Sequence, residues 1–180
     1  MLSQTTTLTI RQMLPTDMDS IMQIQALCYS GDIPESRHSL SAKLQVSPTT
    51  CFVAQDGAQI IAYLIALPWS LQAPPELNAP SCVLPADPDC IYLHDLSVTP
   101  SVRGSKIGGG LVAQLFDLCR RLSYSQLSLV AVQNSADYWR RFGFTNQRLN
   151  SLIREKLASY GDGSEFLVCQ VDGEWPTAPD

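Results

Sequence analysis

The sequence predicts a single mixed α/β domain. Its 180 residues fit one domain, since domains usually run to about 100–200 residues. Hydrophobic residues make up 45% of the chain, which is enough to build a core and excludes a disordered protein. Strand-like and helix-like patterns alternate along the chain, and this order is typical of an α/β fold.

The first part of the chain predicts a strand followed by two helices. Leu8 to Met13 alternates between apolar and polar residues, as a strand does. Pro15 then opens a helix that we expect to be capped by Thr16 or Asp17. Residues 36–46 predict a second, more polar helix that ends before Pro48.

Residues 51–67 predict a β-hairpin, because Asp56-Gly57 separates two apolar runs. The second run is apolar on both faces, which favours a position inside the sheet. Residues 70–90 carry five prolines, so we expect a long surface loop that borders a site. Trp69, just before this loop, is a candidate wall of an acceptor pocket, or else a core residue.

The second half of the chain returns to alternating strands and helices. A strand at 90–98 and a helix at 107–124 are separated by a glycine-rich loop, and Asn134 begins a short helix that ends at Gly143. The remaining elements are strands at 126–132, 144–149 and 165–171, a helical link at 151–160 and a loose tail at 172–180.

Charge and composition exclude several classes of function. The chain has 12 basic and 17 acidic residues, a net charge of −5, so binding to nucleic acid is disfavoured. We see no secretory signal, and the longest apolar run is far short of the roughly 20 residues that span a membrane. The six cysteines form no metal or redox motif. We therefore expect a cytoplasmic protein with reduced thiols and no membrane partner.

The loop after the strand at 90–98 is suited to binding an anion. Arg103-Gly-Ser-Lys-Ile-Gly-Gly-Gly110 combines two cations with glycines at the start of a helix, where unpaired amides and the helix dipole favour negative charge. The lysine precedes the glycine run, so the loop is not a nucleotide-triphosphatase P-loop. The glycine spacing does not match the dinucleotide fingerprint either.

Two motifs together resemble the GCN5-related N-acetyltransferase (GNAT) family. Leu96-Ser-Val-Thr-Pro-Ser-Val-Arg-Gly-Ser-Lys-Ile-Gly-Gly is similar to the acetyl-CoA motif of that family, and Asn134-Ser-Ala-Asp-Tyr-Trp-Arg-Arg-Phe-Gly-Phe is similar to its second landmark. The resemblance implies a GNAT-like domain over residues 1–171, with a mostly antiparallel sheet of six or seven strands flanked by four helices. Leu93-His-x-Leu-x-Val is similar to the branch that acetylates arylalkylamines.

The resemblance implies how acetyl-CoA would bind. The pyrophosphate would lie on the amides at the helix start, and the pantetheine arm would pair with a strand that splays from its neighbour. The Val98 amide would face the thioester carbonyl, and no metal would be needed. The implied cofactor residues are Leu96, Ser97, Val98, Arg103, Gly104, Ser105, Lys106, Ile107, Gly108, Gly109 and Asn134.

The sequence departs from the family pattern at two positions. Lys106 stands where a glycine is usual, so the loop either has ordinary φ there or uses lysine as an added charge for phosphate. Trp139 stands where the family usually has the tyrosine that protonates the departing thiolate, and an indole is no useful acid. Either the adjacent Tyr138 replaces it, or water does, or activity is reduced.

His94 is the candidate general base. An attacking amine must lose a proton, and imidazole titrates near neutrality. We expect His94 on the same strand face as Leu96 and Val98, acting as a base through a water or else as a core histidine. Asp95 then points to the opposite face in a structural role, and His38 is exposed.

The sequence leaves the acceptor open. The main hypothesis is an enzyme that moves an acetyl group from acetyl-CoA to a small primary amine in a ternary complex. The alternatives are a non-catalytic acyl-CoA-binding module and an enzyme that acetylates peptides, protein lysines or N-termini. A homodimer is compatible with the sequence, which does not specify the oligomeric state.

Overall fold

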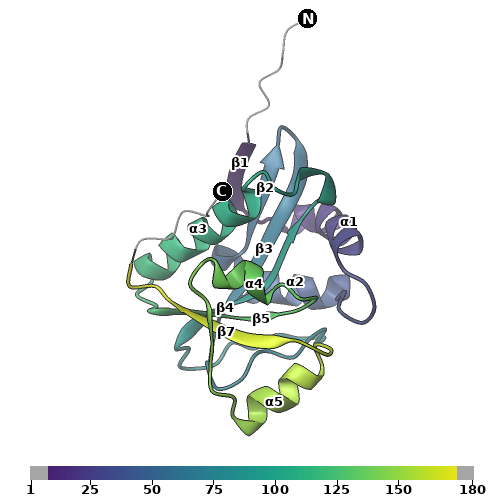
Figure 1. Cartoon of the computed structure of the whole chain (residues 1–180). Coiled ribbons are helices and arrows are strands. Elements are labelled where there is room, and N and C mark those ends of the chain that lie inside the picture. Colours follow the sequence, from purple (N-terminus) through teal and green to yellow (C-terminus); the bar gives the residue numbers. More distant parts are fainter. Residues whose placement is uncertain (1–7, 174–180) are drawn as a thin grey trace, which may run out of the picture.

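The computed structural model describes residues 8–173, which form a seven-stranded sheet with helices on both faces (Figure 1). The strand order is β1-β2-β3-β4-β5-β7-β6, and every neighbouring pair is antiparallel except the parallel pair of β4 and β5. The strands are β1 (Leu8–Gln12), β2 (Phe52–Asp56), β3 (Gln59–Trp69), β4 (Cys90–Val98), β5 (Gln126–Ala131), β6 (Thr145–Asn146) and β7 (Glu165–Gln170). The α-helices are α1 (Met18–Cys28), α2 (Arg37–Val46), α3 (Ile107–Arg121), α4 (Ala136–Arg140) and α5 (Ser151–Ala158).

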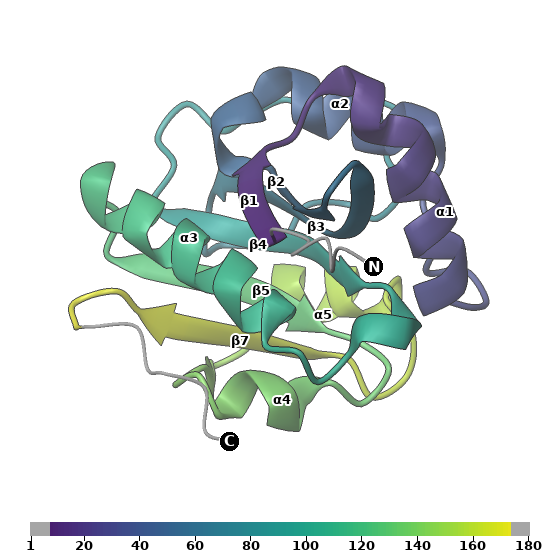
Figure 2. The same cartoon turned by 90° about the horizontal axis from the view of Figure 1, so that it is seen from above.

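The helices divide between the two faces of the sheet, as Figure 2 shows for α3 on one side of β1–β3 and α1 and α2 on the other. Apolar residues of α1 and α2 pack against Val53, Tyr63 and Ile65 of β2 and β3. The same face continues to Tyr92 of β4 and Val168 of β7, on which α5 packs. None of the helices within residues 8–173 is long and apolar enough to cross a membrane.

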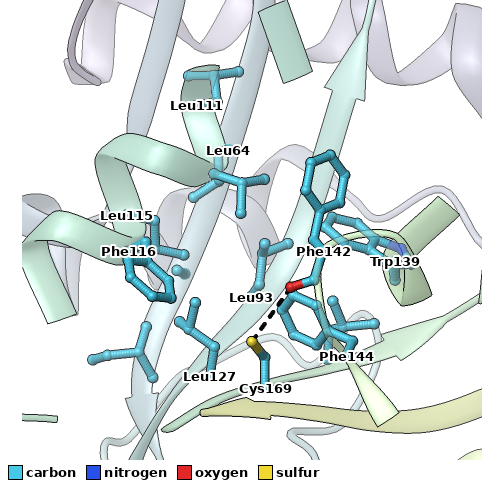
Figure 3. Close-up of a cluster of buried hydrophobic side chains, with 14 of the residues drawn as sticks. Leu64, Leu93, Leu111, Leu115, Phe116, Leu127, Trp139, Phe142, Phe144 and Cys169 are labelled. Atoms are coloured by element: carbon cyan, nitrogen blue, oxygen red, sulfur yellow. Dashed lines mark hydrogen bonds between the residues drawn. The ribbon is translucent and has the colours of Figure 1, made fainter. Parts of the chain in front are cut away.

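The largest hydrophobic cluster lies under α3 (Figure 3). Leu111 and Leu115 project from α3 at a spacing of one turn and are fully buried against the sheet. Each such leucine contributes about 1.5–3 kcal/mol through the apolar surface it removes from water. Trp139, Phe142 and Phe144, from α4 and the segment after it, complete the cluster and hold α4 against the sheet.

Strands β4 and β5 separate part-way along their length. They pair only where Ile91 to Leu93 face Leu127 to Leu129, although β4 continues to Val98. The edge of β4 beyond Leu93 therefore has no strand partner on that side. This confirms the splayed strand that the sequence resemblance implied, and we call the gap the open seam.

A β-bulge in β4 changes the direction of His94. On β3, Ile65 and Ala66 are consecutive, but they pair with Asp95 and Leu93, so His94 is an extra residue. After the bulge, successive side chains again point to alternate faces of the sheet, and Asp95 points to the face that α1 covers. Leu96 and Val98 lie on the α3 side, beside Gly108, and Asp95 lies opposite to them, as the sequence predicted. The expectation that His94 shares the face of Leu96 and Val98 is wrong.

Most predicted elements are confirmed, with differences at some of their ends. The helix expected after Pro15 is a short 3₁₀ turn followed by α1, and the Asp17 carboxylate accepts from the Leu14 amide (2.8 Å) and from Arg11 instead of capping α1. The strand expected at 144–149 shrinks to β6. The long proline loop is confirmed, and the tail expected at 172–180 lies outside the described residues from position 174 onward.

Candidate active site

The open seam leads into a cavity of about 620 Å³. The cavity runs from the start of α3, between β4 and α4, to the end of α1 and the loop before α2. Its lining includes both cationic and acidic side chains. The cationic residues are Arg103, Lys106 and Arg141, and the acidic ones are Glu35 and Asp95.

Along the open seam, the backbone of β4 bonds to side chains instead of to a neighbouring strand. The Leu96 carbonyl accepts from the Tyr29 hydroxyl (3.3 Å), and the Val98 carbonyl accepts from the Cys28 thiol (3.4 Å) and from Arg103 Nε (3.2 Å). A strand residue sends its carbonyl and its amide to the same edge. The amides of Leu96 and Val98 therefore face the open seam as well.

The amino end of α3 provides further amides. The first bond of the helix runs from the Gly110 amide to the Lys106 carbonyl (3.0 Å), so the amides of Ile107, Gly108 and Gly109 precede it and have no helical acceptor. Such a terminus attracts anions. The amides of Arg103 and Ser105 donate instead to carbonyls of the preceding turn, so only part of the loop offers amides to a ligand.

Lys106 has the left-handed backbone conformation that the glycine of the family motif would adopt most easily. Its φ is 63° and its ψ is 9°. The sequence left open whether this loop has ordinary φ at position 106, and the structure shows that it does not. A lysine here costs about 1–2 kcal/mol in backbone strain.

We therefore expect Lys106→Gly to raise the free energy of unfolding by about 0.5–1 kcal/mol, because relief of strain outweighs the added freedom of the unfolded chain. Differential scanning calorimetry should show a melting temperature about 1–4 °C higher. Lys106→Asn, which tolerates the same conformation without the charge, is the matched variant. A lower melting temperature in both variants would contradict the assignment of strain.

Tyr138 and Trp139 have different surroundings. The Tyr138 hydroxyl lies beside the first turn of α3, 3.0 Å from the position that a Cβ on Gly108 would take. Trp139 is 7% exposed and packs edge-on against Phe144 in the core (Figure 3), and part of it lines the cavity. Burial raises the pKa of Tyr138, against an opposing effect of Arg141, so the hydroxyl stays protonated at neutral pH.

His94 is buried and paired with Glu35. Its imidazole is 1% exposed, and Nε2 contacts the Glu35 carboxylate. Nδ1 is buried and has no hydrogen-bond partner among the described residues. Asp95 accepts from the hydroxyls of Tyr29 (2.7 Å) and Tyr63 (2.6 Å), so its carboxylate anchors the bulge to α1 and β3.

Most of the expected site residues lie together, and three do not line the cavity. Asn134 lies beside Gly163, 3.9 Å from where a Cβ on that glycine would be, and the neighbours of Asn134 line the cavity instead. Ser105 turns its hydroxyl to the Val102 carbonyl. Trp69 packs with the cluster under α5 and donates to the Ala73 carbonyl (3.0 Å), which favours the core interpretation.

Sequence reasoning missed the residues that the cavity takes from the first helices. Cys28, Tyr29 and Glu35 come from α1 and the loop after it, and no local pattern marks them. All six cysteines are free, as expected, and His38 is exposed. Among the described residues, no three metal-ligating side chains gather into one site.

The sequence over residues 18–144 matches the profile described as "Acetyltransferase (GNAT) family". The chain belongs to the GNAT acetyltransferase family. No curated protein sequence matches this GNAT protein at a significant level.

Solved structures share the GNAT fold over nearly the whole chain. The loading GNATL domain of CurA from Lyngbya majuscula is 11% identical with a TM-score of 0.73, covering 92% of this chain and 98% of that one. The paia N-acetyltransferase from Thermoplasma acidophilum, in complex with coenzyme A, is 12% identical with a TM-score of 0.66, covering 91% and 99%. A GNAT family acetyltransferase from Brucella melitensis, in complex with acetyl-CoA, is 17% identical with a TM-score of 0.61, covering 96% and 94%.

Proposed function

We propose that this GNAT protein transfers an acetyl group from acetyl-CoA to a small primary amine, by direct attack in a ternary complex. The observation that carries the proposal is the open seam of β4, which ends at the unpaired amides of α3 inside one cavity. Family membership supports it, as do relatives of the same fold whose structures hold coenzyme A or acetyl-CoA.

The cofactor would lie along the open seam. Its diphosphate would accept from the amides of Ile107, Gly108 and Gly109, with Arg103 and Lys106 adding charge. The amide groups of the pantetheine arm would pair with the β4 backbone from Leu96 to Val98. We keep Gly104, Ser105 and Asn134 as loop residues that shape this site without requiring their side chains to touch the cofactor.

The reaction needs a proton acceptor and a proton donor. The amine nitrogen attacks the thioester carbonyl carbon, and the Val98 amide stabilises the oxygen as it gains charge. The carbon–sulfur bond breaks, and the thiolate takes the Tyr138 hydroxyl proton. The amine proton passes to Nδ1 of His94, the ring nitrogen that has no partner among the described residues.

The acceptor would be an amine with an apolar body. Beyond His94, the cavity is lined by the apolar surfaces of Ile33, Leu77 and Tyr160. A Tyr160 hydroxyl bond to the Pro75 carbonyl (2.7 Å) closes this end between α5 and the proline loop. An arylalkylamine fits such a closed, mainly apolar end better than an extended peptide does.

The test is thiol release from acetyl-CoA over a panel of acceptors: arylalkylamines, polyamines and short peptides with free amino groups. We expect turnover with at least one arylalkylamine and none with peptides. Turnover with peptides alone would replace the small-amine proposal. Coenzyme binding without turnover over the whole panel would favour a non-catalytic acyl-CoA-binding module.

Tyr138→Phe should lower kcat about tenfold to a hundredfold and leave the KM for acetyl-CoA nearly unchanged, since only the proton donor is lost. Steady-state kinetics with the best amine of the panel would measure this. Trp139→Phe is the neighbouring control and should keep most of the activity. Full activity of Tyr138→Phe would assign protonation of the thiolate to water.

A further inference from the structure

A buried cluster of charged side chains lies behind His94 and takes no part in the steps above. Glu35, just before α2, and Lys43, within α2, are 3% and 2% exposed at their side chains. Ser39, between them on the same helix face, is fully buried. Burying a charge costs several kcal/mol unless it is paired and hydrogen-bonded. We call Glu35, Ser39 and Lys43 the buried charge cluster.

Every polar atom of Glu35 has a hydrogen-bond partner. Its Oε1 accepts from Lys43 Nζ (2.8 Å), the Ser39 hydroxyl (2.8 Å) and the Asn78 amide (2.8 Å). Its backbone exchanges two hydrogen bonds with the Gln25 side chain, at 2.8 and 2.9 Å. Only Oε2 is left, and it contacts Nε2 of His94. The carboxylate is therefore held in place and pointed at the imidazole.

The chemistry of the cluster selects one form of the imidazole. Burial alone raises the pKa of the Glu35 carboxyl, but His94 and Lys43 outweigh it and lower that pKa below its usual range. An ionised carboxylate only accepts hydrogen bonds, so Nε2 carries the proton. In the neutral imidazole the lone pair is then on Nδ1, the buried atom without a partner among the described residues.

Lys43 has the opposite electrostatic effect. An unbalanced carboxylate would stabilise the imidazolium, which cannot accept a proton. The ammonium group lies 2.8 Å from the same carboxylate and offsets its charge. Glu35 therefore orients the ring and fixes its tautomer, while the Lys43 ammonium offsets the carboxylate charge that would favour the imidazolium.

We propose that Glu35 and Lys43 are positioning residues that hold His94 as a neutral proton acceptor with Nδ1 free for the acceptor amine. The inference rests on the proposed function, in which His94 is the base. Other ionisable groups near the cluster are Tyr92 and Asp95 on β4, Tyr160 after α5 and Cys82 in the proline loop. The hydroxyls of Tyr29 and Tyr63 occupy the Asp95 carboxylate.

The first experiment compares pH–rate profiles of kcat/KM for Glu35→Gln and Lys43→Met. Loss of the carboxylate charge should move the acid limb about one pH unit lower, and loss of the ammonium charge should move it about one unit higher. On the acid side of the profile, Lys43→Met should therefore be slower than the original protein by up to about tenfold, and the two rates should converge in alkali. Asp19→Asn, which breaks an exposed pair with Arg37, is the control and should leave the profile unchanged.

Shifts of the acid limb in the same direction, or no shift in either variant, would overturn the proposal. A single variant leaves a buried charge unpaired and can fail to fold for that reason. In that case the double variant Glu35→Gln/Lys43→Met is measured instead. This double variant keeps the charge balance and loses only control of the tautomer. We expect its acid limb close to that of the original protein and its kcat at least tenfold lower, and an unchanged kcat would refute the inference.

A second measurement does not depend on catalysis. The chain has only two histidines, so ¹⁵N nuclear magnetic resonance of the imidazoles can assign both. We expect His94 as the tautomer protonated on Nε2 and the exposed His38 as a mixture of forms. A His94 protonated on Nδ1 would overturn the proposal even in an active enzyme. An inactive protein with the expected tautomer would instead count against the proposed function.

Discussion

Replacing His94 with glutamine lowers kcat by about 10²–10⁴ at neutral pH, the range expected for the loss of a general base. The reason is that most of a primary amine is protonated at neutral pH and must lose a proton before it can attack. In the original protein the rate should fall on the acid side as the imidazole takes up a proton. In the variant this dependence should disappear, and the rate should recover in alkali, where free amine is abundant.

The measurement is a pH–rate profile of kcat with the best acceptor amine. His38→Gln is the matched control, because His38 is exposed on α2 and lies outside the cavity lining. An unchanged profile in His94→Gln would remove His94 from the mechanism. A uniform loss at all pH values, with no recovery in alkali, would make the residue structural.

Replacing Gly108 with leucine weakens the binding of coenzyme A by at least about 100-fold, or about 2.7 kcal/mol. A Cβ at this position would meet the Tyr138 hydroxyl at 3.0 Å, Val98 Cγ2 at 3.5 Å and Leu96 Cδ2 at 3.8 Å. A leucine therefore fills the space between α3 and the open seam, where the cofactor arm would lie. The helix itself should tolerate the change, since leucine is a better helix former than glycine.

Isothermal titration with coenzyme A tests this prediction. Gly110→Ala is the matched control two residues along, because its Cβ would meet only the end of the Ile10 side chain, at 3.3 Å, on the far side from the seam. We expect binding by the control to stay within about twofold to threefold of the original protein. Equal affinities in all three proteins would mean that the cofactor does not pass between α3 and β4.

The cofactor side of the site could be predicted from the sequence because it is local. One strand, one loop and the start of one helix carry it, from Leu96 to Gly109, and the hydrophobic periodicity fixes each element. The sequence could not predict in the same way which residues of β4 lie on which face of the sheet. The bulge at His94 depends on the register with β3, which no local pattern contains.

The residues around the proposed base, His94, could not be predicted from the sequence for a different reason. Glu35 and Lys43 lie 59 and 51 positions before His94 in the printed sequence, and only the packing of α2 on the α1 side of the sheet brings them together. From the sequence, the helix around Lys43 is a polar, ordinary surface helix. Lys106 is an intermediate case: the motif identified the unusual residue, but only the backbone shows that it has positive φ.

The central claim is that the open seam and the amino end of α3 bind acyl-CoA. Its most direct test is the melting temperature of the unaltered protein with and without acetyl-CoA. At 100 times its dissociation constant, the ligand should add about 2.7 kcal/mol to the free energy of unfolding, or about 5–10 °C for a chain of this size. A melting temperature that stays the same at saturating acetyl-CoA would contradict the account.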